Sequence, residues 1–279
     1  MHLKRQSKTA SGLSLAVYLL AYFNLYVTAF GQPKLSGVID LHAHCAPDSL
    51  PRAIDAVELA KLAQEAGMRG LVLKSHFEPT AMLAYAVRKE VPGLEVFGGI
   101  VLNRAVGGIN PVAVEHMARV TGGWGRVVWL PTVDAENQVR LSKRSGPYVP
   151  IAKDGRLLPE VLEVLALAAK YDLLLETGHA SAEESLLIVR EAKRLGVRHV
   201  VVTHAMISPV SMTITQMQIA ARESALLEFV YGATLGQKPE IRFADYARAI
   251  RAVGPKACIL SSDLGQPGKP LHPVALRLF

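Results

Sequence analysis

Short apolar runs alternate with amphipathic stretches along the chain from residue 38 onward. Val, Ile and Leu dominate the runs, and each following stretch repeats its apolar residues every three or four positions, as one face of a helix does. This alternation predicts strands that are joined by helices. Eight apolar runs fit the pattern, at residues 38–44, 70–76, 94–103, 126–132, 172–179, 198–205, 225–232 and 257–263.

The amphipathic stretches between these runs predict the helices. The first helix is expected at residues 48–67, with Asp48 or Ser49 as its cap and Gly67 at its end. Residues 134–158 fit neither pattern and are expected to form an irregular connection. Further helices are expected near residues 80–90 and 110–120, from residue 159 onward, and at residues 181–195, 213–223 and 242–253.

Strands that are apolar throughout and alternate with helices are typical of a parallel sheet covered by helices. Eight such units favour closure of this α/β chain into a (β/α)8 TIM barrel. A doubly wound open sheet is the alternative, but residues 43–47, after the first strand, lack the glycines of a dinucleotide-binding turn. Few residues follow residue 263, so the last helix is expected to be short or truncated.

The first 31 residues are expected to lie outside the barrel domain, which would span residues 32–279. A basic start precedes an apolar stretch at residues 13–30, and Ala29 and Gly31 supply small side chains for cleavage. This pattern predicts a signal peptide and therefore a secreted or periplasmic protein. The alternatives are an uncleaved N-terminal membrane anchor and a start assigned too far upstream of a cytoplasmic protein.

Composition agrees with a globular domain and narrows the range of partners. The hydrophobic content is 50%, and the formal net charge is +7. Three of these charges, on Lys4, Arg5 and Lys8, lie in the first 31 residues, which leaves +4 on the rest of the chain. The excess is mild and not clustered, so no nucleic-acid partner is expected. The two cysteines, Cys45 and Cys258, do not indicate a disulfide framework.

Four of the predicted strands end in residues that commonly bind metal ions. The first ends with His42 and His44, which share a face because side chains alternate along a strand. The fifth ends with His179, the sixth with His204 and the eighth with Asp263. In a barrel the carboxyl ends of all strands meet at one face, where active sites lie. The sequence therefore predicts a metal site at that face.

This pattern resembles that of the amidohydrolase superfamily of metal-dependent hydrolases, with HxH on strand 1, His on strands 5 and 6, and Asp on strand 8. The match covers roughly residues 36–265. The resemblance implies that His42, His44 and Asp263 bind a divalent ion, and that His179 completes this site or joins His204 around a second ion. It implies one or two ions, zinc first with manganese or iron as alternatives. It also implies that Asp263 accepts a proton from the attacking water.

One position departs from the superfamily pattern. Members with two metal ions usually bring a bridging Lys or Glu from strand 4, where this chain has Thr132. Strand 2 instead ends with Lys74 and His76, which share a face. Lys74 has three interpretations: a bridging metal ligand, a clamp for a substrate carboxylate or phosphate, or an ion-paired structural residue. His76 is a further bridging or substrate-binding candidate.

Two acidic residues lie inside predicted strands. Glu176 is out of phase with His179, so it is expected to face the helices and to form a hydrogen bond there. Glu228 could face the barrel interior, but the phase of its strand is ambiguous from the sequence.

The expected function is the hydrolysis of an amide, cyclic amide, lactone or related ester bond in a small molecule by a metal-activated water. Basic residues of the irregular connection favour an anionic substrate: Arg140, Lys143, Arg144 and Lys153. A phosphoesterase of the polymerase-and-histidinol-phosphatase type is one alternative, although it usually closes with Asp-x-His, whereas Leu264 and Gly265 follow Asp263. A non-catalytic barrel that binds a small ligand is another. A homo-oligomer is also an option, because a short last helix would leave an apolar face exposed.

Overall fold

A computed structural model describes residues 34–279 of the chain. The predicted signal peptide at residues 1–31 lies outside the described residues. Leu35–Phe279 form one unit, and no helix within the described range combines the length and the apolar character needed to cross a membrane.

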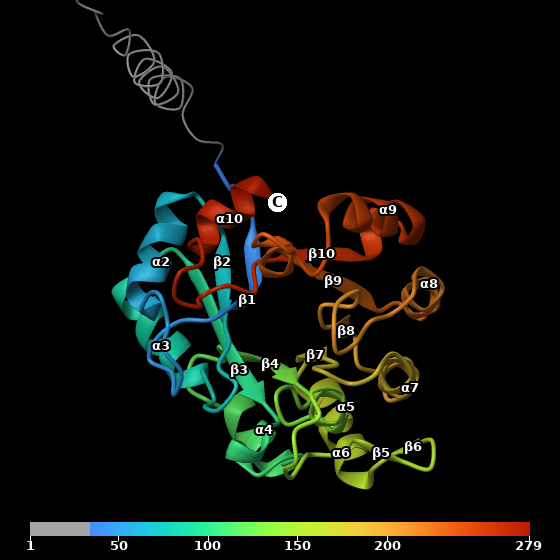
Figure 1. Ribbon diagram of the computed structural model, residues 1–279. Helices are drawn as coiled ribbons and strands as arrows, with labels where there is room; N and C mark the ends of the chain where they lie inside the picture. Colours follow the sequence, from blue (N-terminus) through green and yellow to red (C-terminus); the bar gives the residue numbers. More distant parts are fainter. Residues whose placement is uncertain (1–33) are drawn as a thin grey trace, which may run out of the picture. The chain divides into compact units, whose positions relative to one another are not determined.

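Eight parallel strands form the central sheet, and each corresponds to one of the eight apolar runs (Figure 1). They are β1 (Ile39–Ala43), β2 (Gly70–Leu73), β3 (Glu95–Val101), β4 (Gly125–Trp129), β7 (Leu174–Glu176), β8 (His199–Val202), β9 (Leu226–Val230) and β10 (Cys258–Ser261). Each strand pairs with the next one in this order. The predicted (β/α)8 TIM-barrel fold is confirmed.

Helices surround the sheet on its outer side (Figure 1). They shield the outward side chains of the strands from water, which is why the strands are apolar over most of their length. The helices are α2 (Ala56–Glu65), α3 (Ala81–Glu90), α4 (Pro111–Ala118), α6 (Pro159–Lys170), α7 (Ala182–Arg194), α8 (Ile214–Arg222), α9 (Phe243–Val253) and α10 (His272–Leu278). From α3 to α9 they lie close to the predicted ranges.

Helix α2 begins later than the sequence pattern predicted. Its N-cap is Asp55, whose carboxylate accepts hydrogen bonds from two backbone N–H groups of the first turn. The predicted caps Asp48 and Ser49 lie in the loop after β1, where Asp48 accepts hydrogen bonds from Arg52. The helix ends close to the predicted position. Gly67 follows it with a positive φ of 79°, which the residue after a helix end commonly adopts.

A small apolar cluster lies inside the barrel, separate from the larger cores between strands and helices. Its buried members, which we call the interior cluster, are Val72, Val101, Val127 and Trp129. Lys74 Nζ lies 5.3 Å from the centroid of the Trp129 ring. The polar residues of the barrel mouth therefore lie directly against the interior cluster.

Strand β1 contains an irregularity that turns two successive side chains inward. The register of β1 against β2 shifts between Asp40 and Ala43. Leu41 packs against the interior cluster, and the neighbouring His42 also points into the barrel, where its ring contacts residues of other strands. A β-bulge allows this arrangement. Asp40 Oδ1 holds the bulge by accepting hydrogen bonds from His42 N at 3.2 Å and Ser262 N at 3.0 Å.

The barrel closes where β1 and the residues after β10 meet. His44 N donates a hydrogen bond to Leu264 O at 2.9 Å, and Asp263 N donates to His42 O at 3.0 Å. We call this junction the seam. Three of the predicted metal ligands, His42, His44 and Asp263, lie on its two sides.

The irregular connection predicted at residues 134–158 contains a short helix and a hairpin. They are α5 (Glu136–Leu141) and the antiparallel pair β5 (Ala152–Lys153) and β6 (Arg156–Leu157). The segment follows β4 and precedes α6, so it lies at the carboxyl ends of the strands.

The last helix is short, as predicted, and the residues at its end pack on this barrel. α10 lies beside α2 (Figure 1). The Phe279 ring lies among three aromatic rings at or near α9, with centroid distances of 5.7 Å to Tyr231, 5.9 Å to Phe243 and 6.0 Å to Tyr246.

We expect this aromatic contact to stabilise the closed barrel. Replacing Phe279 with Ala should lower the free energy of unfolding by about 1–3 kcal/mol, because the ring is partly buried and its loss leaves a gap. Leu278→Ala is the matched control: this side chain is 66% exposed, so its truncation should change stability by less than about 0.5 kcal/mol. Urea unfolding of the full chain measures both, and equal effects would contradict the assignment.

Candidate metal centre

Three ligand atoms converge at the seam. His42 and His44 come from the end of β1 and Asp263 follows β10. Asp263 Oδ1 lies 3.2 Å from His42 Nε2 and 3.4 Å from His44 Nε2. Among the described residues this is the one group of three or more His, Cys, Asp or Glu side chains whose ligand atoms all lie within 4.8 Å of one another. The group could bind a divalent metal ion.

The second nitrogen of each of these two histidines is already occupied. His42 Nδ1 lies 3.1 Å from Glu228 Oε1, and His44 Nδ1 lies 3.0 Å from the backbone oxygen of Lys74. Both partners accept hydrogen bonds, so each neutral ring carries its hydrogen on Nδ1. The Nε2 atoms therefore present lone pairs toward Asp263, as the nitrogens of metal-bound histidines do.

These lone pairs and the carboxylate oxygen repel one another unless a proton or a cation lies among them. Lys74 Nζ lies 2.9 Å from His42 Nε2, so the two nitrogens share one hydrogen bond. The Lys74 side chain is only 1% exposed, and burial lowers its pKa. Burial alone raises the pKa of Asp263, whereas positive charge on His42 and a hydrogen bond from His44 lower it well below its usual value when a proton lies between the rings and the carboxylate. With a proton or a cation in that place, Asp263 is ionised at neutral pH.

Glu228 connects two strands of the site. Its side chain is 1% exposed, Oε1 accepts from His42 Nδ1, and Oε2 accepts from His204 N at 2.9 Å. Burial opposes ionisation, but His42 and the other hydrogen-bond donors outweigh it and lower the pKa of Glu228 to about 2. The sequence left its direction open, and the structure places it inside the barrel.

His179 and His204 lie beside the group at the seam. Their ring centroids are 4.9 Å apart, and the His204 ring lies 6.3 Å from that of His42. His179 Nδ1 donates to Gln138 Oε1 of α5 at 2.9 Å. His204 Nδ1 is buried and has no hydrogen-bond partner among the described residues. Burial lowers the pKa of His204 to about 4, as it does that of His44.

Lys74 and His76 both reach the barrel mouth, as their alternation predicted. The His76 ring lies 4.9 Å from that of His44 and 6.5 Å from that of His179. Its Nδ1 lies 2.9 Å from Thr132 Oγ1. His76 thus reaches over the end of β4, where the superfamily pattern places the bridging residue.

The prediction for Glu176 was wrong, because its side chain faces the interior instead of the helices. It is fully buried, accepts a hydrogen bond from Thr203 Oγ1 at 2.9 Å, and is influenced by the charges of Glu228 and Lys74. Burial and the neighbouring Glu228 raise its pKa to about 8. The phase argument failed because Gly178, with a φ of 63°, interrupts the strand geometry before His179.

Three positioning residues were not found from the sequence: Asn103, Gln138 and Thr203. Asn103 ends the third apolar run, but an amide there does not by itself indicate a ligand. Gln138 comes from residues 134–158, which we call the α5 insertion, and no local pattern marks it. Glu228 carried a signal, since an acidic residue inside the apolar run LLEFV is either paired or part of a site.

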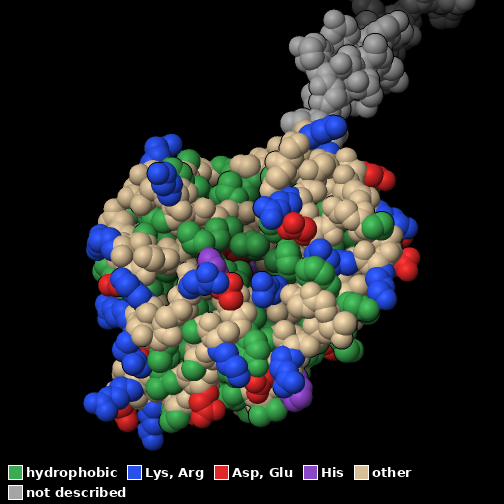
Figure 2. All heavy atoms as spheres, turned by 180° about the vertical axis from the view of Figure 1, so that it is seen from behind, with side chains coloured by type: hydrophobic (Ala, Val, Ile, Leu, Met, Phe, Trp, Pro, Cys, Tyr) green, Lys and Arg blue, Asp and Glu red, His purple; other side chains and the backbone are tan. Residues whose placement is uncertain are grey.

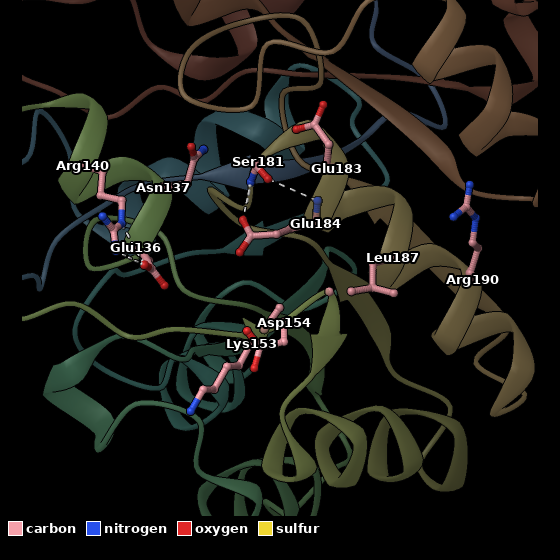
Figure 3. Close-up of a pocket in the computed structure, with 12 residues that line it drawn as sticks. Glu136, Asn137, Arg140, Lys153, Asp154, Ser181, Glu183, Glu184, Leu187 and Arg190 are labelled. Carbon is pink, nitrogen blue, oxygen red and sulfur yellow. Dashed lines mark hydrogen bonds and ion pairs between the residues drawn. The ribbon is translucent and has the colours of Figure 1, made fainter.

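The basic residues of the α5 insertion do not line the mouth. Arg140 and Lys153 line a separate cavity of about 570 Å³ between α5, the hairpin and the start of α7 (Figure 3). None of the clustered histidines lines this cavity. Within it Arg140 pairs with Glu136, and Ser181 and Glu184 form a capping box at the start of α7 (Figure 3).

A smaller cavity of about 220 Å³ opens on the metal centre. Asp263 lines it together with residues of the loops after β8, β9 and β10: Ile207, Gly232, Ala233, Glu240, Gln266 and Lys269. Asp263 is 25% exposed, whereas His42 and His44 are nearly fully buried. The metal centre is therefore accessible from the side of these three loops.

Charged side chains are distributed over the surface without a single basic stripe on the face shown in Figure 2, where Lys and Arg side chains alternate with apolar, neutral and acidic ones. The absence of a nucleic-acid partner stays a prediction.

Comparison with known families assigns the chain to one of them. The model of a family of unknown function, DUF6282, matches residues 37–228. The chain belongs to the DUF6282 family. The matched range includes His42, His44, Lys74, His179 and His204 of this chain, whereas Asp263 lies beyond it. No curated protein matches this DUF6282 chain.

Solved structures share the fold of this DUF6282 member. An amidohydrolase from Pseudomonas aeruginosa matches with a TM-score of 0.57 and 15% identity, over 84% of this chain and 76% of that one. An organophosphorus hydrolase from Deinococcus radiodurans matches with a TM-score of 0.54 and 14% identity, over 88% and 85%. A Pseudomonas putida protein described as a 2-pyrone-4,6-dicarboxylic acid hydrolase gives 0.54 and 17%, over 84% of both chains. The resemblance to the amidohydrolase superfamily is confirmed in the fold.

The buried histidines predict acid sensitivity of the metal-free protein. An unfolded histidine has a pKa of about 6.5, whereas His44 and His204 titrate at about 4 in the fold. As the pH falls from about 6.5 to about 4, the unfolded chain takes up protons that the folded chain does not, so stability falls by about 1.4 kcal/mol per pH unit for each such histidine.

Chemical unfolding in the presence of a chelator, at pH values from 7.5 to 4.5, measures this slope. His204→Asn should make it shallower, because the proton uptake of His204 is removed. His199→Asn is the matched control, since that side chain is 54% exposed at the start of β8 and should leave the slope unchanged. Identical slopes for all three proteins would contradict the prediction.

Proposed function

We propose that this protein is a metal-dependent hydrolase that cleaves an amide, cyclic amide, lactone or related ester bond of a small molecule. The observation that carries the proposal is the convergence of two imidazole lone pairs, from His42 and His44, on the carboxylate of Asp263. The fold shared with an amidohydrolase and an organophosphorus hydrolase supports it.

The residues fit a divalent ion of the zinc type. Two imidazole nitrogens and a carboxylate oxygen are a donor set that zinc binds in catalytic sites, where a further position is left open. Glu228 and the Lys74 backbone fix the two rings from behind, which maintains the ligand geometry. We infer zinc as the first choice, with manganese or iron as alternatives. His179 and His204 are the ligands available for a second ion.

The chain's own residues supply the other parts of the chemistry. A divalent ion bound here would act as a Lewis acid and lower the pKa of water. Asp263, ionised and partly exposed to the mouth cavity, accepts the proton of the attacking water at its carboxylate. The nearly complete burial of His42, His44 and Lys74 keeps other water away from the reacting atoms.

The mouth cavity bounds the substrate. A volume of about 220 Å³ admits a small molecule rather than a polymer segment. Lys269 lies at its rim and Gln266 beside it, so an anionic or carbonyl group of the substrate would bind at this edge. The sequence pattern favoured Arg140 and Lys153 as the partners of an anionic substrate, but these residues line a different cavity. We therefore place the anionic group at the Lys269 edge instead. Lys74 is too deeply buried to clamp a substrate and acts within the metal centre.

Metal analysis tests the proposal. The purified full chain should hold about one or two divalent ions, as catalytic sites of this donor type do, and a His42→Asn/His44→Asn variant should lose them. A His116→Asn/His199→Asn variant is the matched control, since both of these histidines are exposed. Plasma mass spectrometry of the three proteins gives the stoichiometry. A folded wild-type protein that retains no ion after incubation with zinc, manganese or iron would overturn the proposal.

Activity tests the role of Asp263. The loaded protein should hydrolyse at least one member of a panel containing an aryl ester, a lactone, a cyclic amide and a phosphotriester. Asp263→Asn should lower kcat by about 10²–10⁴-fold at saturating metal, the usual contribution of a general base. Asp154→Asn, in the exposed hairpin turn, should keep full activity. A variant of Asp263 with unchanged kcat would contradict its role.

A further inference from the structure

His76 lies in the barrel mouth but outside the group that converges at the seam. Its ring is partly exposed, next to His44 on one side and His179 on the other. Two imidazoles that bind one ion at about 2.0–2.1 Å place their ring centroids about 5 Å apart. The distance of 6.5 Å to His179 is longer than this, whereas the 4.9 Å to His44 is not. His76 nevertheless offers no ligand atom to the group of His42, His44 and Asp263.

The orientation of the Asn103 amide is fixed by backbone groups. Its Oδ1 accepts hydrogen bonds from Thr132 N at 2.8 Å and from Asp134 N at 3.3 Å. Its Nδ2 must therefore be the donor in its two other contacts. These run to His76 O at 3.0 Å and to Thr132 Oγ1 at 2.8 Å.

The orientation of the Asn103 amide determines the direction of the hydrogen bond between the Thr132 hydroxyl and His76. Thr132 is fully buried, and its oxygen already accepts a hydrogen bond from Asn103. The single hydroxyl hydrogen needs an acceptor, and among the described residues the partner in reach is His76 Nδ1 at 2.9 Å. Nδ1 of His76 therefore carries no hydrogen, and the hydrogen of the neutral ring is on Nε2.

His76 thus differs from the other histidines of the barrel mouth whose partners define a tautomer. His42, His44 and His179 donate through Nδ1 and present lone pairs at Nε2. His76 accepts at Nδ1 and presents an N–H group at Nε2, and this nitrogen has no protein partner within the described part of the chain. Burial and the nearby Lys74 lower the pKa of His76, which keeps the ring neutral.

We propose that His76 is a catalytic hydrogen-bond donor, whose Nε2–H binds the carbonyl or phosphoryl oxygen of the substrate and stabilises the negative charge that develops there. Thr132 and Asn103 are its positioning residues. The proposal rests on the hydrolase function proposed above and narrows the substrate to compounds with an acceptor oxygen on the attacked atom. A donor that is already oriented stabilises the transition state more than the ground state.

The tautomer can be measured without a substrate. Long-range proton–nitrogen correlation spectra of the full chain, labelled with ¹⁵N-histidine, distinguish a ring protonated on Nε2 from one protonated on Nδ1. His76→Gln identifies the His76 signals by their disappearance. We expect the Nε2–H tautomer in the wild-type protein and in Thr132→Ser, and its loss in Thr132→Val. A wild-type His76 protonated on Nδ1, or on both nitrogens, at pH 7.5 would overturn the proposal.

Kinetics test the catalytic role with two variants of His76. His76→Leu should lower kcat by about 10²–10³-fold, as loss of one oxyanion donor does, with unchanged metal content. His76→Gln should retain part of the rate, because its amide N–H lies near the position of Nε2–H. Loss of metal in His76→Leu would show that His76 is a ligand instead, and an unchanged kcat would exclude the donor role.

A binding measurement separates this proposal from the hydrolase function itself. If the loaded wild-type protein hydrolyses nothing in the panel, titration calorimetry with methylphosphonate compares wild-type, His76→Leu and His76→Gln. Binding weakened about tenfold or more in His76→Leu and partly restored in His76→Gln supports the donor. Equal affinities, or no binding by any of the three, overturn it. The hydrolase proposal itself fails if the wild-type protein retains no metal ion. That result does not depend on which nitrogen of His76 carries the hydrogen.

Discussion

The buried carboxylate of Glu228 is the group on which the site depends. A charge with 1% exposure is tolerated only if hydrogen-bond donors surround it. Glu228 obtains them from His42 Nδ1 on β1 and from the backbone of His204 after β8. By accepting from Nδ1 it leaves the His42 lone pair on Nε2, directed at Asp263 and Lys74. One acidic residue on β9 thus orients groups on both sides of the barrel.

The clustered imidazoles differ in function because their partners differ. Carboxylate, carbonyl and amide oxygens behind the rings of His42, His44 and His179 accept hydrogens, so these rings offer lone pairs to the mouth. A hydroxyl behind His76 donates instead, so that ring offers a hydrogen. Four chemically identical side chains therefore give the mouth both lone-pair and donor positions, and the residues behind the rings decide which is which.

Much of the fold and the ligand set could be predicted from the sequence because both follow the strand repeat. The apolar runs defined eight strands, and the residues at their ends, such as His42 and His44, necessarily meet at one face. Features that depend on local backbone breaks could not be predicted. Glu176 was placed on the wrong face because Gly178 interrupts the repeat. Asn103 ends the third apolar run, as His76 and Thr132 end the second and fourth, but its hydrogen bonds to them depend on how neighbouring strand ends meet in space.

The position of the candidate metal ligands at the seam has a consequence for folding. Asp40 and Ser262, which are hydrogen-bonded across it, are 222 residues apart in the sequence. An ion held jointly by His42, His44 and Asp263 would act as a cross-link between the first and last strands. Because it would bind the closed seam and leave the unfolded chain, it would stabilise the folded state by its binding free energy. The loaded barrel should therefore open much more slowly than the metal-free one, and its lifetime against proteolysis would depend on the supply of metal.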